Sequence, residues 1–307
     1  MMRYLLIILS LFVCACAGAS DYLFVNGSFN PTKKWTDFSS DNETNVRNLI
    51  QHLAKSKTGK ELLLKAKKKA ANNGETLLDI IKIGNGSLTD TTLTRRFSKD
   101  NPEHIVYESH SIVFVNKNLN QFDALLDLAH ELTHYNYRQD FNPYKLNFTM
   151  SEFIKNTIEA SGGEVHAFVK ECHVLKELFP SKFSTKKNCL DISSNGVISY
   201  QKGIELFYKV GPLYEDFSKL LNMTGLSAQS FPKLSDDSIS FVSSAYGVPY
   251  PIAAFKEYRT VLQKVCENDE RRVAYYKKAG RSPASTNFSQ FVKTYQSKCR
   301  NVTFYEM

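Results

Sequence analysis

Five consecutive residues, His130-Glu131-Leu132-Thr133-His134, carry the residue types and the spacing of a metal site. Two histidines four positions apart lie one turn apart on the same face of an α-helix, so both imidazoles can reach one ion. Catalytic zinc sites usually hold the ion with three protein ligands at about 2.0–2.1 Å and keep a fourth position open. The spacing therefore predicts one Zn²⁺ per chain, with His130 and His134 as two of its ligands.

The glutamate between the histidines has a different expected role. Glu131 is displaced by about 100° around the helix from His130, so its carboxylate lies beside the ion instead of ligating it. Zinc lowers the pKa of a coordinated water to about 7, and a carboxylate beside that water is typical of a general base. We therefore expect Glu131 to be the catalytic residue of a hydrolytic reaction.

The motif lies in a predicted buried helix over residues 121–137. Leu125, Leu126 and Leu128 precede the motif, and its two variable positions are uncharged. The alternative is a core helix whose histidines are satisfied by other protein groups. A His-Glu-His trio that is buried without a metal leaves costly polar groups unpaired, which favours the metal site.

The flanking sequence predicts an α+β chain that is mostly helical. Apolar residues recur at helical spacing over residues 44–72, with a break between two helices at 55–59. Residues 76–83 and 111–115 are predicted to be strands, separated by a polar stretch rich in turn residues. A further helix is expected over residues 150–178, and the rest of the chain is predicted to be mostly helical.

The segment Ala129-His-Glu-Leu-Thr-His134, which follows a predicted strand, resembles the zincin metallopeptidases over residues 105–180. The resemblance implies a zincin-like catalytic core with a small sheet before the active-site helix. It also implies that the chain hydrolyses peptide bonds in a peptide or protein substrate. In that family the upstream strand borders the cleft and pairs with the extended substrate, a role that would fall to Ile112–Val115 in this chain.

The third ligand separates the subclasses of zincins. Metzincins continue with a Gly and a His at positions that hold Tyr137 and Asp140 in this chain, so a ligating Asp140 would depart from their pattern. Gluzincins take a Glu from a later helix, and two residues, Glu159 and Glu164, are placed to supply it. Being five apart, these two glutamates lie about 140° apart on a continuous helix.

The apolar face of that helix favours Glu164 as the third ligand. Glu164 shares the face marked by Val165, Phe168 and Cys172, whereas Glu159 shares its side with charged residues. Ala167 completes a Glu-x-x-Ala arrangement that resembles the third-ligand helices of several gluzincins. The preceding Gly162-Gly163 pair would kink the helix and allow another backbone to approach closely. Glu159 and Asp140 remain the alternatives.

Other polar residues could assist at such a centre. A transition-state oxyanion usually needs a hydrogen-bond donor near the metal, and the sequence does not choose among Tyr135, Tyr137, His166, Tyr246 and Tyr250. His104 and His110 flank the strand region and are interpreted as surface histidines. Asp127, three residues before His130, is a candidate to orient an imidazole.

The first nineteen residues have the layout of an export signal. A short positive start is followed by an apolar run of about ten residues and then by small residues. Cleavage after Ala19 fits the small-x-small rule. A second interpretation is a bacterial lipoprotein box, Val13-Cys14-Ala15-Cys16, which would attach the chain to a membrane through a lipidated Cys16. Both place the protein in a bacterial periplasm or outer envelope, or outside the cell.

Removing the signal leaves four cysteines, an even set that is typical of disulfides in an exported protein. Proximity in sequence favours the pairs Cys172–Cys189 and Cys266–Cys299, although four cysteines allow three pairings. The alternative is four buried free thiols. We expect three segments: the signal over 1–19, a catalytic core over 20–185, and a helical C-terminal subdomain over 186–307.

Composition excludes several classes of protein. The chain of 307 residues is 42% hydrophobic and 23% charged, which is ordinary for a globular protein and not for a disordered one. Its only long apolar run is N-terminal, which argues against a polytopic membrane protein. The net charge of +8 lacks the dense basic runs of a nucleic-acid-binding protein. Two other functions remain: a lipid-anchored envelope protein whose degenerate zincin domain is used only for binding, and a zinc hydrolase that acts on cell-wall crosslinks.

Overall fold

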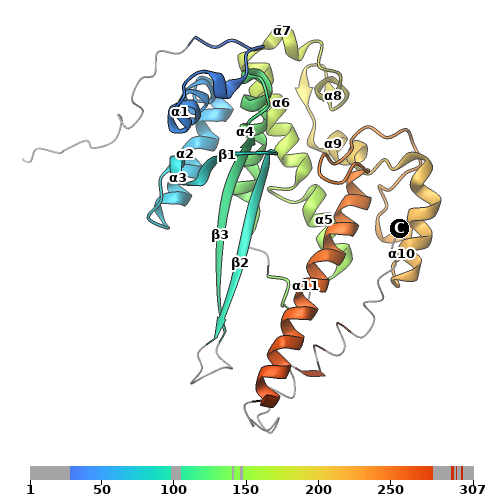
Figure 1. The fold of residues 1–307 in the computed structure, drawn as a ribbon. Helices are drawn as coiled ribbons and strands as arrows, with labels where there is room; N and C mark the ends of the chain where they lie inside the picture. Colours follow the sequence, from blue (N-terminus) through green and yellow to red (C-terminus); the bar gives the residue numbers. More distant parts are fainter. Residues whose placement is uncertain are drawn as a thin grey trace, which may run out of the picture.

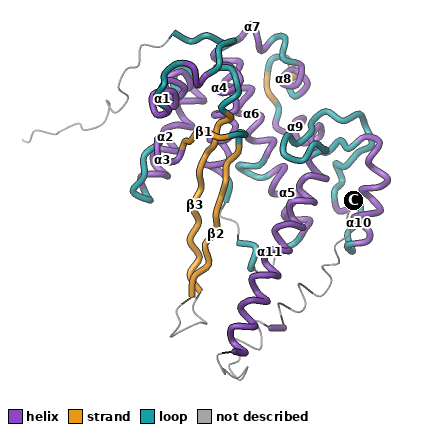
Figure 2. The backbone as a smooth tube through the Cα atoms, viewed as in Figure 1, coloured by secondary structure: helices purple, strands orange, loops and turns teal. Residues whose placement is uncertain are grey.

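A computed structural model describes residues 28–97, 105–139, 142–145 and 148–278, together with residues 292, 293, 295 and 299. The fold is α+β and mostly helical, with a small sheet before the motif helix and helices after it, as predicted (Figures 1 and 2). The predicted signal, including Cys16, lies outside the described residues, as do Asp140 and His104.

Helices and strands of very different lengths follow one another along the chain. In sequence order they are η1 (Trp35–Asp37), α1 (Asn42–Leu53), α2 (Lys57–Ala71), α3 (Leu77–Ile80), β1 (Ile81–Gly84), β2 (Leu88–Phe97), β3 (Ile105–Asn116), α4 (Gln121–Tyr137), α5 (Met150–Glu159), α6 (Glu164–Leu178), α7 (Pro180–Phe183), α8 (Lys187–Asp191), β4 (Ser193–Ser194), β5 (Val197–Ile198), α9 (Tyr200–Phe207), η2 (Gly211–Leu213), α10 (Tyr214–Met223), η3 (Ala228–Ser230) and α11 (Tyr250–Lys278).

The break predicted at 55–59 separates α1 from α2. Asp41 caps the start of α1 by accepting from the backbone N–H of Thr44, and Ser56 caps α2 by accepting from Gly59. Such caps satisfy N–H groups that have no partner inside the helix. Two capped helices in quick succession therefore form a hairpin that packs beside the sheet and α4.

The prediction of a strand over 76–83 is wrong for its first half. Thr76 and Asp79 form a capping box, in which each side chain bonds the other's backbone, so the chain first makes the short helix α3. Only Ile81–Gly84 is extended, as β1. The polar stretch interpreted as turns contains β2, ten residues that pair antiparallel with β3. Its threonines suit a strand that is exposed to solvent for much of its length.

The sheet order is β1-β3-β2, with β1 parallel to β3. Ile81 and Thr89 both lie opposite Val113, so β3 is hydrogen-bonded on both edges. The expectation that Ile112–Val115 pairs with an extended substrate is therefore wrong, because β1 and β2 already pair with its central residues Val113 and Phe114 from both sides. Among the described residues, β1 and β2 are the two edge strands of this sheet, and β2 is the longer of them.

The helix predicted over 150–178 is two helices, α5 and α6, with Ala160–Gly163 between them. The backbone does not merely kink at the glycines. Gly162 adopts a φ of +78°, which is outside the helical region and ends any continuous hydrogen-bond ladder. The facial comparison of Glu159 with Glu164 therefore does not apply, since the two residues belong to different helices.

Helix α4 runs through the centre of the core, with Leu125, Leu128 and Leu132 fully buried. It packs against β3, α2 and α6, and the last two helices flank it in Figure 1. The C-terminal part continues the same core, because Phe207 and Phe241 stack and both contact Phe168 of α6. This part of the C-terminal region therefore packs on the rest of the described chain.

Both predicted disulfides are present. Cys172–Cys189 joins α6 to α8, and Cys266–Cys299 joins α11 to a position 33 residues further along. Disulfides persist in oxidising compartments and are typical of exported proteins. Among the described residues, no helix has the length and apolar character needed to cross a membrane.

Candidate metal centre

His130, His134 and Glu164 converge on one point. The Glu164 carboxylate places one oxygen 3.5 Å from Nε2 of His130 and the other 3.5 Å from Nε2 of His134, and one ligand atom of each residue lies within 4.8 Å of the others. A tetrahedral ion with bonds of about 2.05 Å separates its ligand atoms by about 3.4 Å. The two 3.5 Å distances between the Glu164 oxygens and the histidine nitrogens are too long for good hydrogen bonds. They fit three ligands placed around one small cation.

Of the other two candidates for the third ligand, Glu159 is engaged elsewhere. Glu159, the last residue of α5, accepts from Tyr208 at 2.9 Å and pairs with Lys233 at 2.7 Å. Asp140 lies outside the described residues. Glu164 reaches the centre because it is the first residue of α6, where the chain emerges from the Ala160–Gly163 turn directly over α4.

The ring of His134 is oriented by that turn. Its Nδ1 lies 2.7 Å from the carbonyl oxygen of Gly162, so Nδ1–H donates and Nε2 is left with a free lone pair. A Cβ built on Gly162 would lie 2.1 Å from the backbone nitrogen of Arg138, at the end of α4. The close backbone approach predicted from the glycine pair is therefore confirmed, and it positions His134, one of the candidate metal ligands.

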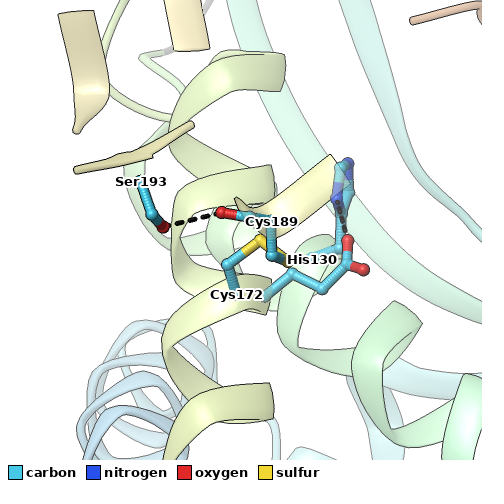
Figure 3. The surroundings of a disulfide bond; sticks show 5 residues. His130, Cys172, Cys189 and Ser193 are labelled. Atoms are coloured by element: carbon cyan, nitrogen blue, oxygen red, sulfur yellow. Dashed lines mark hydrogen bonds and ion pairs between the residues drawn. A yellow bond between two sulfur atoms is a disulfide. The ribbon is translucent and has the colours of Figure 1, made fainter. Parts of the chain in front are cut away.

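The ring of His130 is oriented by Glu171. A carboxylate oxygen of Glu171 lies 3.3 Å from Nδ1 of His130, which again leaves Nε2 facing Glu164. Asp127, which the sequence offered either for this role or as a helix-surface residue, instead hydrogen-bonds Ser87. Glu171 follows Glu164 by two helical turns on the same face of α6, a spacing that could have identified it. Cys172, the next residue along α6, forms the disulfide to Cys189 that Figure 3 shows together with His130.

Glu131 lies beside the centre and does not ligate. Its side chain is buried, and the Thr89 hydroxyl on β2 lies 2.8 Å from its carboxylate and 2.9 Å from its backbone carbonyl oxygen. Burial raises the pKa of Glu131 to about 7. A carboxylate with a pKa near neutrality can both take up and release a proton, as a general base must.

The protonation states of the ligands suit a divalent cation. Burial alone would raise the pKa of Glu164, but the two imidazoles and Arg138 lower it to about 2, so it is an anion. Burial lowers the pKa of His134 to about 3, so its ring is neutral. Burial also opposes the charge of His130, but Glu164 and Glu171 more than offset this and raise its pKa. A metal would displace that proton.

Two hydrogen-bond donors border the ligands. The phenol of Tyr250, at the start of α11, interacts with Glu164, and its pKa is raised by burial and by the neighbouring carboxylates, so it stays protonated. A guanidinium nitrogen of Arg138 lies 3.6 Å from Glu164 and 3.4 Å from Nδ1 of His134. Tyr250 is one of the donors that the sequence offers, whereas Arg138 was not singled out, although it follows His134 by four residues at the end of the same helix.

The remaining candidate donors have other roles. His166 accepts from the backbone N–H of Gly162 at 3.0 Å and so supports the turn. Lys65 lies over the ring of Tyr137, and Lys69 lies over the ring of Tyr135. Two further residues lie toward solvent: Tyr246, which is 38% exposed, and His110, which pairs with Glu75. His110 is thus a surface histidine, as predicted.

Comparison with protein-family models, curated proteins and solved structures found no match. The chemistry of this centre is therefore inferred from its own geometry.

Proposed function

We propose that the protein is an exported zinc-dependent metallopeptidase of the gluzincin type. The convergence of His130, His134 and Glu164, with each Nε2 facing a separate oxygen of one half-buried carboxylate, carries the proposal. Two neutral nitrogens and one carboxylate are a ligand set that zinc uses in hydrolytic enzymes.

Each residue of the centre has a role in this proposal. When bound, zinc supplies Lewis-acid polarisation of the scissile carbonyl and makes water more acidic. Glu131 accepts a proton from the attacking water and returns it to the leaving amine. Tyr250 donates a hydrogen bond to the oxygen that gains negative charge, and Arg138 balances the anionic Glu164.

The edge strand β2 offers a place for the substrate backbone. Its residue Thr89 contacts Glu131, and Leu88, the first residue of the strand, is 46% exposed. An extended peptide that adds to this edge would satisfy free backbone groups and lie next to the general base. The proposed substrate is therefore an extended segment of peptide or unfolded protein.

Export is supported by the disulfides and by the signal-like sequence over residues 1–19. Cleavage after Ala19 would release the chain, whereas lipidation of Cys16 would hold it at a membrane. Mass spectrometry of the mature N-terminus distinguishes the two products.

Replacing the general base tests the proposed function. We expect Glu131→Gln to retain about one zinc per chain and to lower the rate of peptide cleavage by at least about 10²-fold. The amide keeps the size of the side chain but cannot take up the proton. Zinc content is measured by elemental analysis, and cleavage is measured on a library of fluorogenic peptides.

Glu61→Gln, an exposed substitution on α2, is the matched control and should leave both quantities unchanged. Full activity in Glu131→Gln would overturn the assignment of the base. Zinc binding by the wild type without cleavage of any peptide would instead support a domain that is used only for binding.

A further inference from the structure

A cavity adjoins the Ala160–Gly163 turn that holds His134. This half-open cavity of about 470 Å³ is lined by the end of α5 and by the segment around Phe231. This volume is within the usual range of small-molecule sites, about 300–1,000 Å³. Its apolar wall is made by Phe231, Pro232 and Ala160, and its polar groups come from Lys155, Asn156, Glu159, Tyr208 and Lys233.

The acidic group of the cavity is already neutralised. One oxygen of Glu159 accepts from the buried Tyr208 at 2.9 Å, and the other pairs with Lys233 at 2.7 Å. The backbone carbonyl of Glu159 also accepts from Tyr200 at 2.6 Å. These contacts hold the floor of the cavity in one arrangement and leave little negative charge to attract a cation.

Lys155 supplies a positive charge that the described part of the chain does not neutralise. It precedes Glu159 by one helical turn, a spacing at which Lys and Glu often pair, but Glu159 is taken by Tyr208 and Lys233. The Lys155 ammonium lies 5.9 Å from the centre of the Phe231 ring, and no carboxylate of the described residues pairs with it. The cavity therefore combines an available positive charge with an aromatic wall.

We propose that this cavity binds a small organic carboxylate with a flat apolar body. The carboxylate would accept from the Lys155 ammonium and the Asn156 amide, and the apolar body would pack against Phe231 and Pro232. A charge-assisted hydrogen bond supplies orientation, and burial of the apolar part supplies affinity.

The site is separate from the metal centre but shares a turn with it. Ala160 lines the cavity, and its carbonyl oxygen accepts from the backbone N–H of Gly163 at 2.8 Å. The carbonyl that orients His134 belongs to the neighbouring residue Gly162. The proposal requires neither zinc nor peptidase activity, so it can fail or succeed independently of the proposed function.

Titration calorimetry with sodium 3-phenylpropanoate on the full chain tests the proposal. We expect saturable binding with a stoichiometry of about one per chain. Both 3-phenylpropanamide, which lacks the charge, and acetate, which lacks the ring, should bind roughly tenfold more weakly or worse. Lys155→Gln should weaken 3-phenylpropanoate roughly tenfold, and Lys155→Arg should largely restore it.

Lys219→Gln, on the exposed side of α10, is the control for a general loss of positive charge and should bind like the wild type. Thermal unfolding of each variant checks that the fold is retained. Equal binding of the acid and the amide, equal affinity in the wild type and Lys155→Gln, or no saturable binding to the wild type would each overturn the proposal.

Discussion

At the scale of single residues, the two candidate histidine ligands are held through the nitrogen that does not face the centre. Glu171 fixes the Nδ1 of His130, and the Gly162 carbonyl fixes the Nδ1 of His134. Such outer contacts set the tautomer and the direction of the ring, so they contribute to metal affinity without touching the metal.

Glu171→Leu should lower zinc affinity by roughly 10–100-fold, because His130 loses the carboxylate that orients it. Glu171→Gln should lie between this variant and the wild type, since an amide oxygen can still accept from Nδ1–H. Competition with a chromophoric chelator measures the affinity. Glu205→Gln, an exposed change on α9, should have no effect; if it weakens zinc as much as Glu171→Leu does, the orienting role is wrong.

At the scale of elements, the centre depends on how α4, α5 and α6 meet. The Ala160–Gly163 turn ends α5, passes over the last turn of α4 and starts α6 with Glu164. Because Gly162 has no side chain, its backbone lies against Tyr137 and Arg138. The turn thereby joins the third ligand to the two histidines.

Gly162→Ala should destabilise the fold and weaken zinc binding. Gly225→Ala is a matched control, because Gly225 has the same φ of +78° but has nothing within 4 Å of an added Cβ. The control should cost about 1–2 kcal/mol for the left-handed backbone alone. The Gly162 variant should cost about 1–3 kcal/mol more, from the clash with α4. Denaturant unfolding measures both, and equal losses would contradict the close approach.

Helices α2 and α6 are joined by Glu177, whose carboxylate accepts from the backbone and the hydroxyl of Thr58 at 2.9 and 2.6 Å. Burial opposes the charge of Glu177, but these bonds outweigh it and lower its pKa. The stabilisation is complete above the unfolded pKa of about 4.3 and is lost as the pH falls through the lower folded value.

Glu177→Gln should therefore be less stable than the wild type at neutral pH, and the difference should shrink as the pH falls below about 4. Urea unfolding at a series of pH values measures the difference. If the difference in unfolding free energy stayed constant or grew toward low pH, the folded state would not favour the ionised form of Glu177.

At the scale of the whole molecule, the centre is assembled from segments that are distant in the sequence. Thr89 comes from the edge strand, the histidines from the central helix, Glu164 and Glu171 from α6, and Tyr250 from the start of α11. A ligand that binds only when these segments are in place stabilises the folded state by mass action.

Removing zinc with a chelator should lower the melting temperature of the wild type. The stabilisation is roughly 4 kcal/mol when free zinc is about 1,000-fold above its dissociation constant. Glu164→Gln removes the carboxylate from the three converging ligands, so the chelator should shift its melting temperature much less. Calorimetry with and without added zinc measures the shift, and an unchanged wild-type melting temperature would argue against a bound metal.

The sequence by itself determined the local features of this protein. The His130–His134 spacing, the helix that carries it and the strand before it depend on periodicity and residue type, which act over a few residues. Both disulfide pairs followed from proximity along the chain, and Glu164 was preferred over Glu159 from a helical face, although the two residues belong to separate helices.

Only the tertiary structure decided which distant groups meet. The capping box at Thr76 turned a predicted strand into a helix, and the pairing of β2 with β3 moved the free sheet edge away from Ile112–Val115. Thr89 joins the centre because the sheet places β2 beside α4, and no local pattern records that contact. Contact between residues far apart in sequence depends on how the whole chain packs, whereas spacing within one helix is set by its geometry.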